Sequence, residues 1–163
     1  MIYLIEREQW IPTSQEKAFE FFSRPENLNS ITPSWVQFRI HSRVPPTLSS
    51  GSLIDYTIWL AGAPLRWQTR IGHWDPPHAF VDLQERGPYL LWEHLHAFEP
   101  MGEGVLMTDS LRYRLPLGPI GRAVHSTMVR VVLERIFDHR FRAVREIFGE
   151  PIHLRSCRAK LGS

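Results

Sequence analysis

The chain has 163 residues, of which 43% are hydrophobic and 22% charged, and its formal net charge is +2 at pH 7. This composition excludes a disordered or fibrous chain and predicts one globular domain over residues 1–150, followed by a tail over 151–163. No stretch approaches the roughly 20 apolar residues of a membrane span, and the first ten residues lack the features of a signal peptide, so we expect a cytoplasmic protein.

Cysteine and arginine usage narrow the chemistry further. The single cysteine, Cys157, excludes an internal disulfide and leaves too few thiols for a zinc knuckle. Arginines in the last third alternate with acidic residues, as Arg135 does with Asp138, and this pattern is typical of the solvated face of a helix. No basic stripe with a base-stacking motif is present, so we expect no nucleic-acid partner.

The N-terminal part of the chain predicts one strand and two short helices. The strand is expected over about 2–12. The segment TSQEKAFEFFS then offers Thr13 or Ser14 as an N-cap, with apolar residues at helical spacing behind it. A second helical turn is bracketed by Pro25 and Pro33, and the segment VQFRI begins the next strand.

The rest of the chain predicts an antiparallel meander and one long helix. Strand-like runs alternate with Gly and Pro turns up to about residue 115. The last segment has no Gly or Pro from Arg122 to Phe148, its apolar residues recur at helical intervals, and Gly149 supplies a stop. A helix of that length would measure about 40 Å. We therefore expect it to lie across a wide, curved sheet.

Turn lengths predict which residues of the meander lie opposite one another. A three-residue loop at 87–89 sets Asp82 opposite His94, and a four-residue loop at 100–103 sets His94 opposite Asp109. The other expected pairs are Phe80 with His96, Ile58 with Trp67, Tyr56 with Thr69 across a turn at 62–63, His73 with Phe80, Ile71 with Asp82, Thr69 with Gln84, His96 with Met107 and Trp92 with Leu111. These pairings give one mostly apolar face with a few convergent polar groups, which is how ligand pockets are lined.

The order of the elements and three motifs resemble a known family. The motifs are F-x-D-x-Q-x-x-G-P from Phe80, W-x-H-x-H-x-F from Trp92 and T-D-x-x-x-Y from Thr108. They resemble the START-like, helix-grip (SRPBCC) superfamily in its polyketide cyclase/dehydrase and ligand-binding branch, and the similarity covers nearly the whole chain. It implies an α+β helix-grip fold: a curved antiparallel β-sheet wrapped around a long C-terminal α-helix, with two short helices after the first strand.

The resemblance also implies a function, because relatives bind lipids, sterols, polyketides, plant hormones or quinones. It implies binding of a small hydrophobic or amphipathic molecule in a cavity between the sheet and the C-terminal helix, and it carries over no catalytic residue set. The side chains expected to line this site are Tyr56, Ile58, Trp67, Phe80, Asp82, Gln84, Trp92, His94, His96, Phe98, Asp109, Leu111, Tyr113 and Met128.

Several interpretations of the polar cluster stay open. His94 and Asp109 are candidates for an acid-base pair in a cyclase/dehydrase-type enzyme. The same residues could instead be a buried network that fixes strand register. A metal site of His94, His96 and Asp109 is a third alternative, but H-x-H spacing alone is weak evidence, and we expect no metal and no cofactor. We favour a non-catalytic ligand-binding protein, with a protein-binding adaptor and a homodimer as further alternatives.

Overall fold

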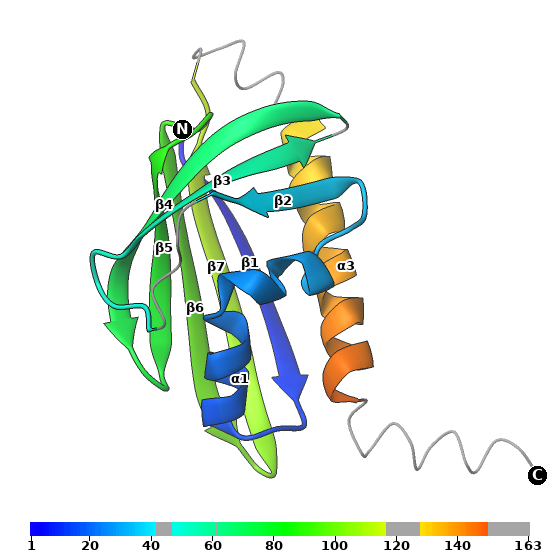
Figure 1. The fold of residues 1–163 in the computed structure, drawn as a ribbon. Helices are drawn as coiled ribbons and strands as arrows, with labels where there is room; N and C mark the ends of the chain where they lie inside the picture. The colour runs from blue at the N-terminus through cyan, green and yellow to red at the C-terminus, as the bar shows by residue number, and fades with distance from the viewer. Residues whose placement is uncertain (42–46, 61, 117–127, 150–163) are drawn as a thin grey trace, which may run out of the picture.

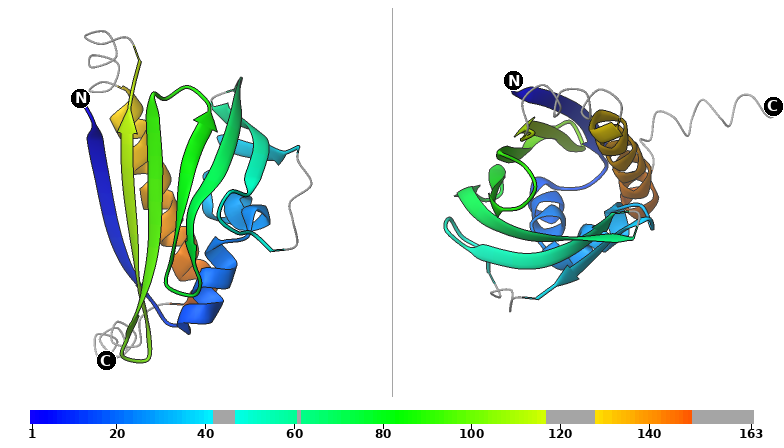
Figure 2. Two further views of the ribbon diagram at one scale, coloured as in Figure 1. Left: turned by 90° about the vertical axis from the view of Figure 1, so that its left-hand side faces the viewer. Right: turned by 90° about the horizontal axis from the view of Figure 1, so that it is seen from above.

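In the computed structural model, seven antiparallel strands form one sheet that curls around a C-terminal helix (Figures 1 and 2). The structure describes residues 1–41, 47–60, 62–116 and 128–149. The strands are β1 (Tyr3–Ile11), β2 (Val36–Ile40), β3 (Leu53–Leu60), β4 (Ala63–Asp75), β5 (Ala79–Arg86), β6 (Leu91–Met101) and β7 (Gly104–Arg114). The helices are α1 (Gln15–Phe22), the 3-10 helix η1 (Pro25–Ile31) and α3 (Arg130–Phe148).

The caps expected from the sequence are present at both ends of the fold. The Ser14 side chain accepts a hydrogen bond from the Lys17 backbone N–H at the start of α1. Gly149 ends α3 with a φ of 98° and donates its backbone N–H to the Arg145 carbonyl. The long helix was predicted to begin at Arg122. Its described part begins at Arg130, and residues 122–127 lie outside the described residues.

The sheet leaves a gap between its two edge strands, and α3 occupies that gap. Strand order is β1-β7-β6-β5-β4-β3-β2, so β1 and β2 are the edges. The view from above in Figure 2 shows the sheet curling into a half-barrel, with α3 between these edges. The Gln9 side chain of β1 donates a hydrogen bond to the Phe141 carbonyl of α3 at 2.9 Å. This arrangement confirms the helix-grip fold expected from the sequence.

Two of the predicted hairpin registers hold at the polar cluster. Asp82 lies opposite His94, and Phe80 lies opposite His96, as the three-residue loop at 87–89 predicted. On the other side of β5, Ile71 pairs with Asp82 and Thr69 with Gln84. The prediction that Phe80 pairs with His73 is wrong, because a register shift at Gly72 sets Phe80 opposite Trp74. A Cβ on Gly72 would lie 2.6 Å from Leu83 Cδ1, so a larger residue at this irregular position would displace the Leu83 side chain.

The β6–β7 and β3–β4 registers differ from the prediction by two residues each. The turn after β6 contains two residues, not four, because Gly102 adopts a φ of 62° and lets the strand continue through Met101. Leu60 pairs with Ala63, so the turn between β3 and β4 begins one residue earlier than predicted. Gly62 in this turn has a φ of 85°. The observed pairs are His96 with Asp109, His94 with Leu111, Trp92 with Tyr113, Phe98 with Met107, Tyr56 with Trp67 and Ile58 with Leu65. A shift of two keeps every side chain on its predicted face.

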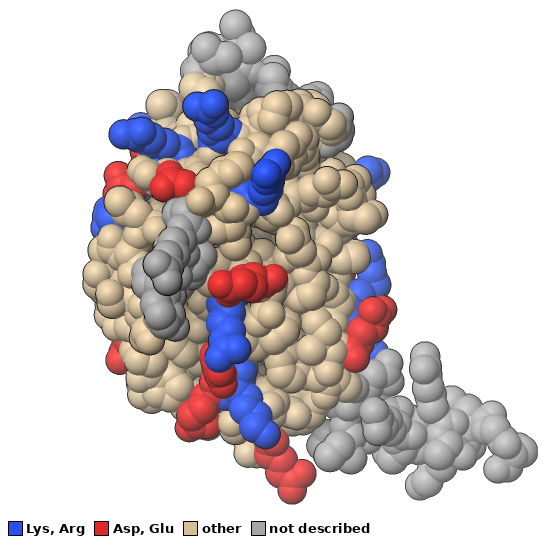
Figure 3. Space-filling view, in the orientation of Figure 1, with Lys and Arg blue, Asp and Glu red and all other residues tan. Residues whose placement is uncertain are grey.

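The hydrophobic core includes three clusters, of which the smallest consists of Leu48, Ile54 and Ile71. A second cluster surrounds α1 and includes Phe19, Phe22 and Phe98, and a third joins Tyr113 to Phe137 of α3. The convex face carries cross-strand polar pairs, such as Arg112 with Glu93. In Figure 3 acidic and basic side chains alternate in the lower half of the visible face. No helix within the described ranges is long and apolar enough to cross a membrane.

Candidate functional site

A cavity of about 200 Å³ lies between the concave face of the sheet and α3. Its aromatic walls are Phe38, Tyr56, Trp67, Tyr89, Trp92 and Phe137, and its aliphatic walls include Ile58, Leu65, Val132, Leu133 and Ile136. The polar groups that reach it are those of Thr32, Thr69, Asp82, His94 and Arg140. A smaller hollow of about 40 Å³ toward α1 shares Tyr56, Thr69 and Asp82 with it. The site is therefore mostly apolar, with its charged groups gathered where β5, β6 and α3 meet.

The structure brings only part of the predicted site to this cavity. Those that line it are Tyr56, Ile58, Trp67, Asp82, Trp92 and His94. Phe80, Phe98, Leu111 and Tyr113 are also on the concave face, but they are fully packed in the core. His96 and Asp109 are buried and do not line the cavity, and Asp109 contacts the cavity residue His94.

Two predicted residues have other positions for identifiable reasons. The Gln84 side chain donates to the Tyr89 carbonyl at 2.7 Å and accepts from the Tyr89 backbone N–H, so it holds the loop between β5 and β6. Met128 precedes α3, and its side chain is 59% exposed to solvent. Neither side chain is part of the cavity wall.

The polar cluster is organised around the Asp109 carboxylate. His94 Nε2 lies 3.0 Å from Asp109 Oδ1, and His96 Nδ1 lies 2.8 Å from the same oxygen. The other nitrogen of His96, Nε2, is 3.3 Å from Asp82 Oδ2. Nη2 of Arg140, on α3, lies 3.4 Å from Asp109 Oδ1 and 3.3 Å from His96 Nδ1. The side chains of His94, His96 and Arg140 thus contact the buried Asp109 carboxylate, and Asp82 contacts the other nitrogen of His96.

The two histidines differ in protonation although they are neighbours on one strand. Burial, followed by the proximity of His96, lowers the pKa of His94 to about 4, against the effect of its hydrogen bond to Asp109. Burial also disfavours the charged form of His96, but hydrogen bonds to Asp109 and Asp82 outweigh it and raise the pKa of His96. His94 is therefore neutral at pH 7, and its Nε2 donates to the ionised Asp109.

Arg140 determines the charge state of Asp109. Burial opposes ionisation of this carboxyl, but the Arg140 guanidinium and the two imidazoles outweigh burial and hold the pKa of Asp109 well below its usual range. The Arg140 guanidinium also lies over the Phe22 ring, 5.0 Å from its centroid. An aromatic face and an ion pair together fix this side chain at the junction of α3 and the sheet.

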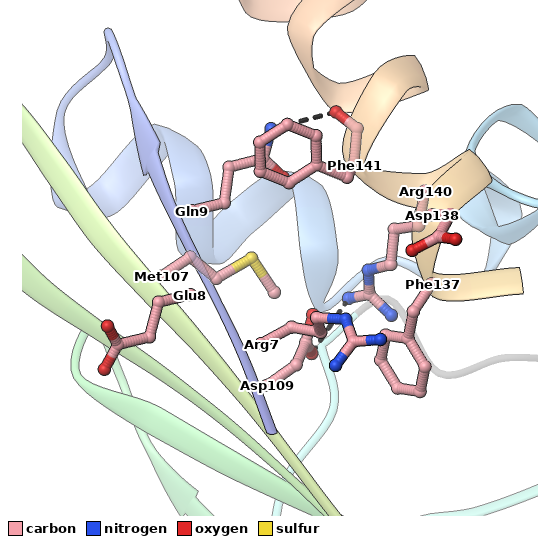
Figure 4. A pocket seen from close by; sticks show the side chains of 9 residues that line it. All are labelled: Arg7, Glu8, Gln9, Met107, Asp109, Phe137, Asp138, Arg140 and Phe141. Carbon is pink, nitrogen blue, oxygen red and sulfur yellow. Dashed lines mark hydrogen bonds and ion pairs between the residues drawn. The ribbon is translucent and has the colours of Figure 1, made fainter. Parts of the chain in front are cut away.

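A narrow crevice between β1 and α3 reaches the same cluster from outside (Figure 4). Arg7, Gln9 and Phe141 border it, and Asp109 and Arg140 form its inner end. Figure 4 shows the Arg140 guanidinium directed at Asp109. Phe137 and Arg140 line both this crevice and the main cavity, so they form the partition between the two.

Three further polar groups in the cavity are held by one another. The Tyr56 hydroxyl lies 2.7 Å from Thr69 Oγ1, which also accepts a hydrogen bond from Trp67 Nε1 at 3.1 Å. Burial raises the pKa of the Tyr56 and Tyr89 hydroxyls, so both stay neutral at physiological pH. This side of the cavity therefore offers hydrogen bonds without charge.

Several residues that line the cavity were not predicted from the sequence, and Arg140 is a charged residue among them. It lies on the inner face of α3, in line with Leu133, Phe137 and Val144, which are all buried. An arginine within an apolar helical stripe is the signal that could have identified it, because a charge placed there needs a buried partner. Val36 and Phe38 of β2 and Tyr89 of the loop before β6 also line the cavity, and no comparable signal in the sequence identified them.

One candidate for metal binding is present among the described residues. Asp82, His94 and His96 each offer one ligand atom, and these atoms lie within 4.8 Å of one another. The carboxylate differs from the one considered from the sequence, because Asp109 is already engaged by both histidines and Arg140.

No family model and no curated protein matches the chain. Solved structures do match it over most of its length. A Thermus thermophilus protein has a TM-score of 0.70 and 18% identity, covering 88% of this chain and 95% of that chain. The Zhui aromatase/cyclase from a Streptomyces species has a TM-score of 0.69 and 13% identity, covering 88% and 92%. Major latex-like protein 151 from Panax ginseng has a TM-score of 0.66 and 16% identity, covering 90% and 97%.

These similarities define the class of fold. The chain has the helix-grip fold that polyketide aromatase/cyclases and major latex-like proteins share, as the sequence resemblance implied. Identities below 20% establish the fold alone, so the function has to be argued from the cavity and its polar cluster.

Proposed function

We propose that the protein binds a small hydrophobic or amphipathic molecule, such as a lipid, polyketide or quinone, in the cavity between the sheet and α3. The observation that carries this proposal is the cavity of about 200 Å³ whose walls are mainly aromatic and aliphatic. Ligand pockets of roughly 300–1,000 Å³ bury drug-sized molecules, so this cavity suits a small molecule or one end of a longer one.

The shape of the walls favours a ligand with a flat or ring-containing apolar part. Trp67 and Trp92 meet edge to face with centroids 5.0 Å apart, and Tyr89 lies 4.8 Å from Trp92. Such aromatic walls give large apolar contact at little cost in side-chain freedom. The polar end of the ligand would meet Asp82, His94 and Arg140. One structural neighbour is an aromatase/cyclase, which supports a ligand of this class.

Paired substitutions on α3 test whether the cavity is the binding site. Val132 lines the cavity, whereas Val131 is 40% exposed on the outer side of the same helix. We expect Val132→Trp to fill the cavity and weaken binding of an apolar fluorescent probe at least tenfold, with Val131→Trp as the control that leaves it unchanged. Equal affinity of both variants and the wild type would place the probe elsewhere and contradict the proposal.

A second candidate function, proton transfer to a bound substrate, is favoured by the contact between His94 and Asp109. His94 lines the cavity and is oriented by a carboxylate at 3.0 Å, which is the arrangement of a positioned general base. A pKa of about 4 makes His94 a weak base at neutral pH, so we rank this function second. Exchange of the α-hydrogens of an aromatic ketone in D₂O tests it, because turnover requires faster exchange with the wild type than with His94→Gln.

A further inference from the structure

We propose that Asp82, His94 and His96 form a binding site for a divalent transition-metal ion, such as Zn²⁺ or Fe²⁺, at the polar side of the cavity. One donor atom from each residue lies within 4.8 Å of the other two. Two imidazoles and one carboxylate are a donor set with which proteins hold such ions, and it leaves coordination positions open. Donors about 2.1 Å from one ion lie roughly 3.4 Å apart, so movements of about an ångström close the site.

The hydrogen bonds of Asp109 orient both imidazoles for this role. Asp109 Oδ1 contacts Nε2 of His94 and Nδ1 of His96, so one nitrogen of each ring is held by the carboxylate. The remaining nitrogen of His96 already faces Asp82 at 3.3 Å. The remaining nitrogen of His94, Nδ1, has no hydrogen-bond partner within the described part of the chain. Metal-binding histidines usually donate their second nitrogen to a carboxylate in this way.

The charges of the cluster also call for a cation. Asp82 and Asp109 bring two negative charges, and Arg140, which pairs with Asp109, brings one positive charge. The remaining negative charge, on the partly buried Asp82, is therefore stabilised by a neighbouring positive charge. A proton on His96 supplies it in one state of the protein. A metal ion that displaces this proton supplies it in another, with Asp82 as its anionic ligand.

The surroundings keep the proposed ligands in place and leave the ion accessible. The His96 ring stacks on Phe80 with centroids 4.3 Å apart, and the His94 ring meets Phe137 edge to face at 5.6 Å. The Asp82 side chain is 29% exposed and lines the cavity, as His94 does. An ion held there would face the proposed ligand cavity, where an oxygen atom of an occupant could complete its coordination. Only this last step rests on the proposed ligand-binding function.

Titration of the chelator-stripped protein with Co²⁺ and with Zn²⁺ tests the site without any organic ligand. We expect one equivalent to bind, with visible Co²⁺ absorption bands that report histidine coordination. Asp82→Asn removes the anionic donor. It should therefore weaken Zn²⁺ binding in calorimetry by at least the roughly 10- to 100-fold that loss of a ligand-orienting partner costs. Glu93→Gln, the same chemical change on the opposite face of β6, should leave the affinity unchanged. Equal binding by wild type and Asp82→Asn would overturn the proposal.

Nitrogen NMR of the histidines gives a second test, which uses the wild-type protein and therefore does not depend on whether a variant folds. Saturating Zn²⁺ should shift the ring nitrogens of His94 and His96 and remove the proton from His96 Nε2. A His96 ring that stays doubly protonated would show that the proton alone balances the cluster, and would overturn the proposal. Binding of the apolar probe in EDTA tests the ligand cavity separately from the metal site. If the probe binds in EDTA and no metal binds in the titrations, the metal proposal is wrong and the ligand-binding proposal stands.

Discussion

His94 and Asp109 contact each other although they do not lie opposite one another in the sheet. His94 pairs with Leu111 and Asp109 with His96, yet His94 Nε2 reaches Asp109 Oδ1 at 3.0 Å. Diagonal neighbours on adjacent strands are within reach of such side chains. Because Arg140 approaches the same oxygen, Asp109 holds β6, β7 and α3 together at one buried point.

Loss of the Asp109 charge should therefore be strongly destabilising. We expect Asp109→Asn to lower the free energy of unfolding by about 3 kcal/mol or more, because it leaves Arg140 buried without its anionic partner. Urea denaturation at pH 7 measures this. Glu93→Gln breaks only the exposed ion pair with Arg112 and should cost less than about 1 kcal/mol. Similar losses for both variants would show that the cluster is not the structural centre described.

His94 should make the protein less stable as the pH falls. Its folded pKa is about 4, and the unfolded chain binds this proton near the ordinary value of about 6.5. The stability that neutral His94 contributes is therefore complete above about pH 6.5 and is lost as the pH falls toward 4. In EDTA, His94→Gln should lose less stability than the wild type over this range, as followed by urea midpoints. An unchanged acid slope would argue against a neutral, buried His94.

His96 should make the protein less stable as the pH rises. Its folded pKa is raised, so its contribution is complete below the unfolded value of about 6.5 and is lost as the pH rises through the folded pKa. His96→Gln in EDTA should therefore remove a loss of stability on the alkaline side. It should also reduce the acid-side effect of His94 without abolishing it, because burial lowers the pKa of His94 more than the proximity of His96 does. The same urea series measures it, and two variants that alter only the same limb would show that the protonation states are assigned wrongly.

Arg140 should control the ionisation of Asp109. The guanidinium is the main favourable influence on this buried carboxylate, so Arg140→Met should raise the pKa of Asp109 toward or above its ordinary range. Carbon-detected NMR titration of the Asp109 carboxyl measures this shift. Arg135→Met, on the exposed outer face of α3, is the control and should leave the pKa unchanged. An unshifted Asp109 in the Arg140→Met protein would assign its low pKa to the histidines alone.

Substitutions of core residues and of cavity residues should differ in their effects on stability and on probe affinity, although both sets lie on the concave face. Phe98 is 1% exposed and packs against Phe19, Phe22 and Phe80, so Phe98→Ala should cost about 4 kcal/mol of stability. Its affinity for the apolar probe should stay unchanged at a temperature where the variant is folded. Ile58→Ala, at the cavity wall, should change the affinity at a smaller cost in stability. The opposite pattern would move the binding site to α1.

The face of each strand could be predicted from the sequence, whereas the pairing across two turns could not. Side-chain alternation assigned His94 and His96 to one face, and the three-residue loop predicted at 87–89 correctly placed Asp82 on the same face. Pairing depends on where each turn begins, and Gly102 permits either a two-residue or a four-residue turn. The error of two residues moved Asp109 from His94 to His96 without moving it off the face. The strand residues of the polar cluster were therefore predicted, whereas their contacts were not.

The contribution of α3 was the largest omission, and its cause is physical. The sequence pattern gave the helix and its apolar stripe, but a helix can pack on a sheet at many rotations and offsets. Only the observed position brings Arg140 to Asp109 and aligns Val132, Leu133 and Ile136 with the aromatic wall. Long-range packing of this kind is specified by the assembled surfaces, not by spacing within one segment.

The most direct test of the proposed binding function is native mass spectrometry of the protein purified from its own host, followed by denaturing extraction of any bound molecule. The ligand-binding account predicts a stoichiometric organic adduct on the wild type and on Val131→Trp, and its loss from Val132→Trp. An adduct that Val132→Trp retains in full, or a wild type that carries none and takes up no apolar molecule, would contradict it.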